Sequence, residues 1–337
     1  MLLRLILFLL FISCLASANT LPSTLRDGST RFLARSLGSS CYTMDSVQKG
    51  LPCNPAAIAK DRARRFDADI FMGSNLEYIK EAEDLLKGKE DEAAVAKFFS
   101  RRENIEGEFS FEASFQAPKW GVSFEPYRIV AISRMENPSL PMIDLLIAEE
   151  QSVKGQAGTY LYENLYAGIQ VRYTHVRFIG QYFALSEAFA GNSQEILASE
   201  TQELVYVEPG LLYAWEDLAW QPQISAMLSQ WGFSDRKTEE YPIKPEGLLG
   251  TSIKPLVPLG LFELGVQFHL HSETENARDA FRVAAAYELG ILHAVASVSE
   301  YDHSAGFLLT FKNFTSGLTY WSEKVSRGVF IQMGITL

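Results

Sequence analysis

The fold is decided by residues 108–117, Glu-Phe-Ser-Phe-Glu-Ala-Ser-Phe-Gln-Ala. Every odd position in this stretch is apolar and every even position is polar. Successive side chains of a β-strand point to opposite faces, so the stretch predicts a strand with one apolar and one polar face. The same alternation recurs at 169–174, at 281–289 and at 329–337, where the sequence finishes.

Two architectures use strands of this kind. In a soluble sandwich the apolar face points into the core, whereas in an outer-membrane barrel it points to lipid and the polar face lines the lumen. The runs span about ten residues, the length that a tilted membrane strand requires. Aromatic residues gather near the strand ends, as expected of interfacial girdles. We therefore expect an all-β fold, a transmembrane antiparallel β-barrel, with the sandwich as the competing architecture. The aromatic residues concerned are Trp120, Tyr160, Tyr162, Tyr166, Trp215, Trp220, Tyr320 and Trp321.

Residues 283–299 are nearly all apolar and could be mistaken for a membrane helix. Glu288 and His293 in the middle of the run would be costly in lipid. The alternation and Gly290 predict two strands joined by a tight turn instead.

Composition excludes several classes of function. The 337 residues are 47% hydrophobic and carry a formal net charge of −11, from 30 Lys and Arg against 41 Asp and Glu. Nucleic-acid binding requires clustered positive charge, so we expect no nucleic-acid partner. Three cysteines are too few for a disulfide-dense scaffold or a multi-cysteine zinc module.

The first 18 residues have the features of a secretory signal peptide. Arg4 supplies the positive start, residues 5–12 are an apolar run, and Ala16-Ser17-Ala18 forms a cleavage site. A membrane anchor is the alternative, but the apolar run is shorter than the ~20 residues that span a bilayer. Export exposes the chain to an oxidising compartment, where Cys41 and Cys53 can form a disulfide. Two buried free thiols remain the other possibility.

Residues 76–101 form a polar stretch with apolar residues at helical spacing, interrupted near Gly88. We expect one or two helices in a loop or cap. Packing on the barrel rim is favoured over a dedicated partner-binding helix.

The segment between the signal and the first strand contains Arg35-Ser36-Leu37-Gly38, then Asp45, then Asn54-Pro55-Ala56-Ala57-Ile58-Ala59. This arrangement resembles the N-terminal region of the FadL-like outer-membrane barrels, which include the PorV-like branch. The resemblance implies a barrel of about 14 strands whose N-terminal segment fills the lumen as a plug. The residues that match the plug motif are Ser36, Gly38, Asp45, Asn54, Pro55 and Ala56.

The physics of this motif points the same way. Asn54 suits a helix N-cap, and Pro55 suits the first helical position, which requires no N–H donor. The chain departs from the family pattern in the cysteine pair that brackets the segment and in its final Leu337.

The sequence offers a few candidate catalytic or metal-binding groups, but a structural role explains each of them better. His269 and His271 share a strand face, and Ser272 follows, but a third metal ligand and a recognisable acidic partner are missing from the pattern. Glu108 and Glu112 are expected to line the lumen against Arg172 or Arg282 rather than to form an acid–base pair. We expect no enzyme activity, cofactor or metal site.

The sequence thus predicts a signal peptide at 1–18, a plug at 19–65 and a barrel at 66–337 with a helical insertion at about 76–101. The predicted location is the outer membrane of a Gram-negative bacterium, in contact with its lipid. The predicted function is passive uptake of a hydrophobic small molecule. The alternative is a PorV-like carrier, scaffold or surface barrel that binds protein partners, for example through the helical cap. An outer-membrane hydrolase and a soluble periplasmic sandwich rank lower.

Overall fold

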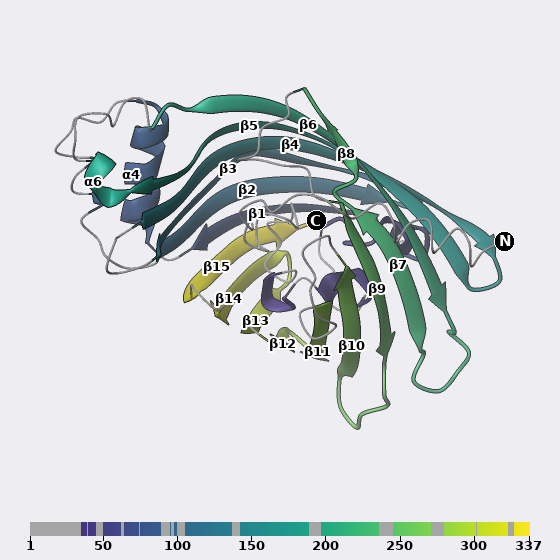
Figure 1. Cartoon of the computed structure of the whole chain (residues 1–337). Helices are drawn as coiled ribbons and strands as arrows, with labels where there is room; N and C mark the ends of the chain where they lie inside the picture. Colours follow the sequence, from purple (N-terminus) through teal and green to yellow (C-terminus); the bar gives the residue numbers. More distant parts are fainter. Residues whose placement is uncertain are drawn as a thin grey trace.

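Fourteen antiparallel strands close into one barrel in the computed structural model (Figure 1). The described residues are 35–38, 40–44, 50–61, 64–73, 75–88, 95, 98, 99, 105–136, 142–188, 197–235, 245–270, 280–300, 302–322 and 327–337. The barrel strands are β1 (Arg65–Gly73), β2 (Ile105–Ala117), β3 (Trp120–Glu136), β4 (Met142–Tyr162), β5 (Leu165–Ala184), β6 (Glu200–Ala214), β7 (Gln223–Ser229), β9 (Glu246–Ile253), β10 (Leu261–Leu270), β11 (Phe281–Leu289), β12 (Leu292–Ser299), β13 (His303–Phe311), β14 (Phe314–Ser322) and β15 (Arg327–Thr336).

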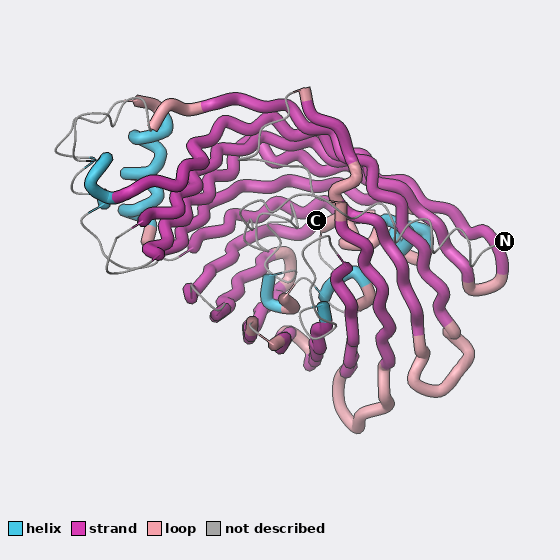
Figure 2. Tube along the Cα trace, viewed as in Figure 1, coloured by secondary structure: helices cyan, strands magenta, loops and turns pink. Residues whose placement is uncertain are grey.

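The barrel closes where β1 pairs with β15, and the two ends of the barrel differ. At one end, which we call the turn end, strands are joined by short turns such as 118–119, 163–164, 290–291 and 312–313. At the other end, the loop end, the connections include residues 74–104 and 185–199. Strands β2–β6 extend well beyond the shorter strands β10–β15 toward the loop end (Figures 1 and 2).

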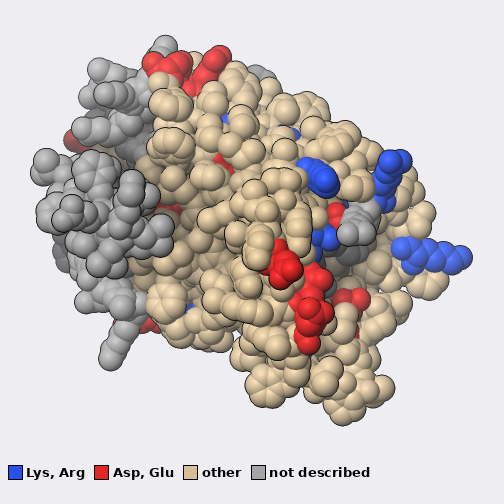
Figure 3. Space-filling model, turned by 90° about the vertical axis from the view of Figure 1, so that its right-hand side faces the viewer, with Lys and Arg blue, Asp and Glu red and all other residues tan. Residues whose placement is uncertain are grey.

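Each strand presents one apolar and one polar face, as the alternation predicts. On β4, Val153 is 48% exposed on the outside, whereas its neighbour Lys154 is 3% exposed on the inside. Outward positions on most strands carry exposed Phe, Val, Ile, Leu or Tyr, which gives the barrel an apolar outer band. On the face shown in Figure 3 most of the surface is uncharged, and the charged side chains form a few small groups.

The N-terminal segment lies inside the barrel. It contains two short 3-10 helices, η1 (Ser40–Tyr42) and η2 (Pro55–Ala59), and their residues are almost all buried. Apolar plug residues such as Leu37, Tyr42 and Met44 pack on small or apolar inward residues of the wall, including Ala284 and Leu308. The described plug residues therefore occupy part of the barrel interior.

The helical insertion covers the outer surface of the strand extensions at the loop end. Helix α4 (Leu76–Leu86) buries Ile79, Ala82 and Leu85 against outward-facing residues of β3–β5, and Val95, Phe98 and Phe99 join the same cluster. Another short helix, α6 (Leu185–Ala188), follows β5. None of the helices in the described part of the chain is long and apolar enough to cross a membrane.

A polar belt separates the helix-covered zone from the apolar band. Glu149 lies opposite Arg177, and Gln151 lies opposite His175, which is opposite Glu203 on β6. All five occupy outward positions, and on β4 and β5 apolar outward residues lie on both sides of the belt. The belt thus marks where the lipid-facing part of these strands ends.

The structure confirms the predicted barrel of about 14 strands with a plug and a short helical cap. It also confirms the hairpin at 283–299, since β11 and β12 are joined at Gly290, whose φ is +59°. The signal peptide at 1–18, Asp45, His271 and Ser272 lie outside the described residues. The predicted domain boundaries at 18 and 65 remain predictions.

Candidate functional site: the plugged barrel interior

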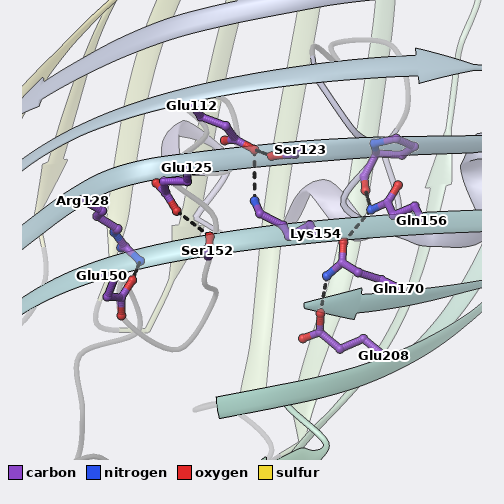
Figure 4. Close-up of polar contacts among 11 residues, drawn as sticks. Glu112, Ser123, Glu125, Arg128, Glu150, Ser152, Lys154, Gln156, Gln170 and Glu208 are labelled. Carbon is purple, nitrogen blue, oxygen red and sulfur yellow. Dashed lines mark hydrogen bonds and ion pairs between the residues drawn. The ribbon is translucent and has the colours of Figure 1, made fainter. Parts of the chain in front are cut away.

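Arg128 is at the centre of a buried ion-pair network on the inner wall. Its Nη1 donates to Glu150 Oε2 at 2.9 Å (Figure 4). Its Nε donates to Glu108 Oε1 at 3.1 Å. Arg128 is fully buried, so removal of either carboxylate would leave an incompletely neutralised charge away from water. The three residues come from β3, β2 and β4 and therefore tie three adjacent strands together.

The network continues toward the turn end. Lys154 Nζ donates to Glu112 Oε1 at 3.1 Å, and Ser152 Oγ donates to Glu125 Oε2 at 3.2 Å (Figure 4). Farther along, Gln156 Nε2 donates to Gln170 Oε1 at 2.6 Å.

Glu208 of β6 extends the same polar ladder. It accepts a short hydrogen bond from Gln170, and Arg172 Nη2 lies 3.5 Å from its Oε1. The Arg172 guanidinium also stacks over the Tyr206 ring at 4.2 Å. The polar faces of β2–β6 thus carry a series of hydrogen-bonded and ion-paired groups, as expected for a charged lumen.

The expected cation partners were wrong. Glu108 and Glu112 do line the interior, but they pair with Arg128 and Lys154 instead of Arg172 or Arg282. A bulge in β3 explains the difference, because the register of β3 shifts between Glu125 and Arg128 against β4. The extra residue brings two side chains three positions apart onto the same inner face. Pro126 lies in this bulge, where a missing N–H costs the ladder nothing.

An apolar cluster interrupts the polar interior toward the loop end. It is formed by inward residues of β3–β6, which are at most 7% exposed and adjoin the Arg128 network along each strand. The members are Val130, Ile132, Leu146, Ala148, Val176, Phe178, Leu204 and Tyr206. Polar lumens of large barrels are usually lined by charged and amide side chains, so this patch is the feature of the wall that suits an apolar molecule.

Asn54 and Pro55 shape the plug helix η2. Asn54 Oδ1 accepts from the Ala56 N–H at 3.0 Å, and Asn54 Nδ2 donates to the Leu211 carbonyl at 3.2 Å. Asn54 is therefore both the cap of the helix and an anchor to β6. Gly168 and Gly210 of the wall lie so close to Pro55 and Asn54 that a Cβ atom at either glycine would overlap the plug.

The first part of the plug is held by the opposite side of the wall. Ser304 Oγ donates to the Ser36 carbonyl at 2.7 Å, and the Ser36 hydroxyl forms a short hydrogen bond with Thr319. Arg282 Nη1 donates to the Gly38 carbonyl at 2.5 Å. Gly38 has a φ of +54°, a left-handed conformation that glycine adopts without strain.

The structure places a disulfide between Cys41 and Cys53, with a Cα–Cα distance of 5.8 Å. It links η1 to the segment that leads into η2. Thr43 beside it is bonded through its carbonyl to Ser252 Oγ at 3.0 Å and to Gln223. The plug is thereby fixed to itself and to β7 and β9.

Arg35 anchors the first described turn of the plug, and the sequence analysis did not single it out. Its guanidinium lies 4.0 Å from the centre of the Phe330 ring and pairs with Glu106 at 3.3 Å and with Glu108. No sequence signal distinguishes this arginine from its neighbours, because its partners lie about 70 and 300 residues away.

The wall changes at the junction of β7 and β8 (Gly232–Ser234). β7 pairs with β6 as far as Met227 and with β9 as far as Ser229, whereas β8 continues the ladder only with β6. The left-handed Gln230, with a φ of +54°, is the extra residue between the two segments. Trp231 and Phe233 beyond it are 48% and 68% exposed. Within the described residues, β8 thus has a strand partner on one side only.

The histidine pattern resolves into a structural pair. His269 Nδ1 lies 2.9 Å from Glu246 Oε1, and its ring contacts Tyr42 of the plug edge-on. No group of three or more His, Cys, Asp or Glu able to hold a metal ion occurs among the residues that the structure describes.

No family model matches the sequence, and no curated protein matches it either. Several solved structures are similar in architecture. The CymD monoaromatic hydrocarbon channel has 10% identity and a TM-score of 0.44, covering 90% of this chain and 95% of its own. The Pseudomonas putida toluene transporter TodX has 9% identity and a TM-score of 0.44, covering 90% and 96%.

Other similar structures have different functions. CdiB from Acinetobacter baumannii has 6% identity and a TM-score of 0.36, and the match covers 82% of this chain but only 60% of CdiB. The chain is a closed, plugged β-barrel. The range of functions among the similar structures assigns no substrate to it.

Proposed function

We propose that this barrel mediates passive uptake of a hydrophobic small molecule across an outer membrane. The observation that carries the proposal is the apolar cluster of β3–β6, which lies inside the wall instead of facing lipid. These side chains are buried against one another inside the wall and have no contact with lipid. An apolar ligand that lay against them would be stabilised by about 25 cal/mol for each Å² of its own apolar surface removed from water.

The partial wall at β8 supports a lateral path. Beyond Ser229 the ladder between β7 and β9 stops, while exposed Trp231 and Phe233 continue the apolar outer surface. A molecule that leaves the interior here would pass directly into lipid. The plug, bonded to β1, β6, β7, β9, β11, β13 and β14, obstructs the straight route through the barrel.

The two ends of the barrel support an orientation. Outer-membrane barrels have short turns on the periplasmic side and longer loops outside. We infer that the turn end faces the periplasm and that the loop end, with α4 and the strand extensions, faces the exterior. The apolar cluster then lies on the side from which a ligand arrives.

A scaffold function is supported less well. Helix α4 buries its apolar face on the barrel wall, which leaves Leu76 as its large exposed apolar residue within the described helix. The described helix of the cap therefore keeps no apolar stripe for a protein partner. We favour uptake over partner binding on this ground.

Uptake can be measured with radiolabelled 2-phenylethanol in cells whose lipopolysaccharide layer is intact. We expect cells with the barrel to take up the label faster than cells without it. The Val176→Asn variant should slow uptake about tenfold, because a buried methyl pair becomes a polar amide. Arg177→Gln, at the next position but on the outer face, is the matched control. Uptake that is independent of the barrel, or equal in both variants, would contradict the proposal.

A further inference from the structure

A buried carboxylate of the interior has one oxygen that no hydrogen-bond donor among the described residues reaches. Glu125 lies at the β3 bulge, is 1% exposed, and accepts from Ser152 Oγ through Oε2 at 3.2 Å. Its other oxygen, Oε1, is buried and has no hydrogen-bond donor among the described residues. An unsatisfied buried carboxylate oxygen is costly and calls for a functional explanation.

A second unsatisfied acceptor lies in the same row of the wall. Glu125 is opposite Ser152, Ser152 is opposite Thr174, and Thr174 is opposite Leu204. Thr174 Oγ1 is buried and likewise lacks a hydrogen-bond partner within the described part of the chain. Neighbouring strands are about 4.8 Å apart, so the two acceptors flank Ser152 on either side. Leu204 connects the row to the apolar cluster.

The nearby cations are already engaged. Arg128 pairs with Glu108 and Glu150, and Lys154 pairs with Glu112. Arg35 pairs with Glu106 and Glu108, so with Glu125 five carboxylates of this neighbourhood face three cations. A carboxylate ligand would add to an existing excess of negative charge, whereas an ammonium group would offset it.

We propose that this row is the polar subsite of the uptake channel and that it selects hydrophobic amines in their protonated form. The ammonium group donates to Glu125 Oε1 and Thr174 Oγ1, and the apolar part of the ligand lies on the cluster that contains Leu204. This inference rests on the proposed uptake function and specifies the class of its substrate. The β3 bulge supplies the geometry, because it directs both Glu125 and Arg128 to the inside.

The test compares three ligands with the same phenyl ring and two-carbon chain: 2-phenylethylamine, 2-phenylethanol and phenylacetate. Binding to the purified full-length barrel is measured by equilibrium dialysis at pH 7. We expect the amine to bind at least about tenfold more tightly than phenylacetate, as charge-assisted hydrogen bonds predict. Glu125→Gln should weaken amine binding about tenfold and leave 2-phenylethanol within about twofold.

Glu163→Gln is the matched control, since it removes the same charge from an exposed turn. Thr174→Val keeps the size of the side chain and should weaken amine binding about three- to fivefold. It tests the subsite independently if the Glu125→Gln variant does not fold. The inference is overturned if wild-type protein shows no preference for the amine, or if Glu163→Gln has the same effect as Glu125→Gln. Failure of this selectivity with 2-phenylethanol uptake intact removes only the subsite, whereas absence of all uptake removes the proposed function.

Discussion

Inward-facing glycines allow the plug and the wall to approach each other. Gly168 and Gly210 meet Asn54 and Pro55, and Gly250 and Gly265 meet Thr43 and Met44. Each lies on the polar face of its strand, where larger side chains otherwise line the lumen. Single residues without a side chain thus decide where the plug can sit.

The change Gly168→Ala should therefore disturb the plug. A Cβ atom there overlaps the Pro55 carbonyl group, and overpacking of this kind costs about 1–3 kcal/mol. Gly155→Ala on β4 is the control, because its Cβ would meet open space. Thermal unfolding followed by differential scanning calorimetry should show a lower Tm for Gly168→Ala alone. Equal Tm values would mean that the plug shifts freely.

The disulfide should matter to the plug and little to the barrel. Closing a loop of this length contributes ~3 kcal/mol, so the Cys41→Ser, Cys53→Ser double variant should raise hydrogen exchange in residues 40–59 by about a hundredfold. The heat-modifiable gel mobility of the barrel should not change. Wild-type protein treated with a reductant is the control, and unchanged exchange in both samples would contradict this expectation.

At the scale of the element, bulges decide which residues meet. The alternation in the sequence predicts correctly that Glu108 and Glu112 face inward. It does not predict Arg128 as a partner, because residues three positions apart in a regular strand, as Glu125 and Arg128 are, lie on opposite faces. The register between neighbouring strands depends on how many extra residues each strand contains. A sequence that alternates regularly on both sides of a bulge does not reveal that number.

Deletion of Pro126 should consequently be tolerated. It removes the extra residue while Glu125 and Arg128 stay on the same face, so the barrel should still show heat-modifiable mobility. Deletion of Val130 in the same strand should abolish barrel formation, because it turns the following side chains to the wrong face. Equal outcomes for the two deletions would show that the bulge has no role in register.

The helical cap is attached through the apolar face of α4. Leu85 is 4% exposed and packs with the β3–β5 extension, so Leu85→Asp should cost about 2–5 kcal/mol of cap docking. Leu76→Asp, at a position that is 51% exposed, is the matched control. Limited proteolysis should cut residues 74–104 faster in Leu85→Asp only. Equal cleavage in both variants would indicate that α4 is not docked through this face.

For the molecule as a whole, alternation and the aromatic positions favoured a barrel, and the resemblance of the N-terminal motif to FadL-like barrels implied the plug and about 14 strands. They did not predict that strands β2–β6 extend farther toward the loop end than strands β10–β15. Residues 145–148, Leu-Leu-Ile-Ala, are all apolar and do not alternate. The reason is that α4 covers the outer face of β4 here, while the inner face belongs to the apolar cluster of the interior. An unbroken apolar run inside an alternating strand is the signal that could have shown both.

The polar belt predicts where the bilayer lies. Val171 is an outward residue, 46% exposed, on the turn-end side of the belt, whereas His175 belongs to the belt itself. Val171→Arg should reduce membrane stability by about 2–4 kcal/mol, whereas His175→Arg should change it by about 0–1 kcal/mol. Urea-dependent folding into lipid vesicles measures both. A similar cost at the two positions would place the bilayer edge elsewhere.

The distribution of plug contacts has a consequence for assembly of the barrel. Residues 35–61 are made early in synthesis, yet their hydrogen-bond partners include Ser304 and Thr319 on two of the last strands. The seam between β1 and β15 forms only when the final residues arrive. The hydrogen bonds that hold Ser36 to β13 and β14 can therefore form only after those strands have been made, so the plug is completed late although its residues come first.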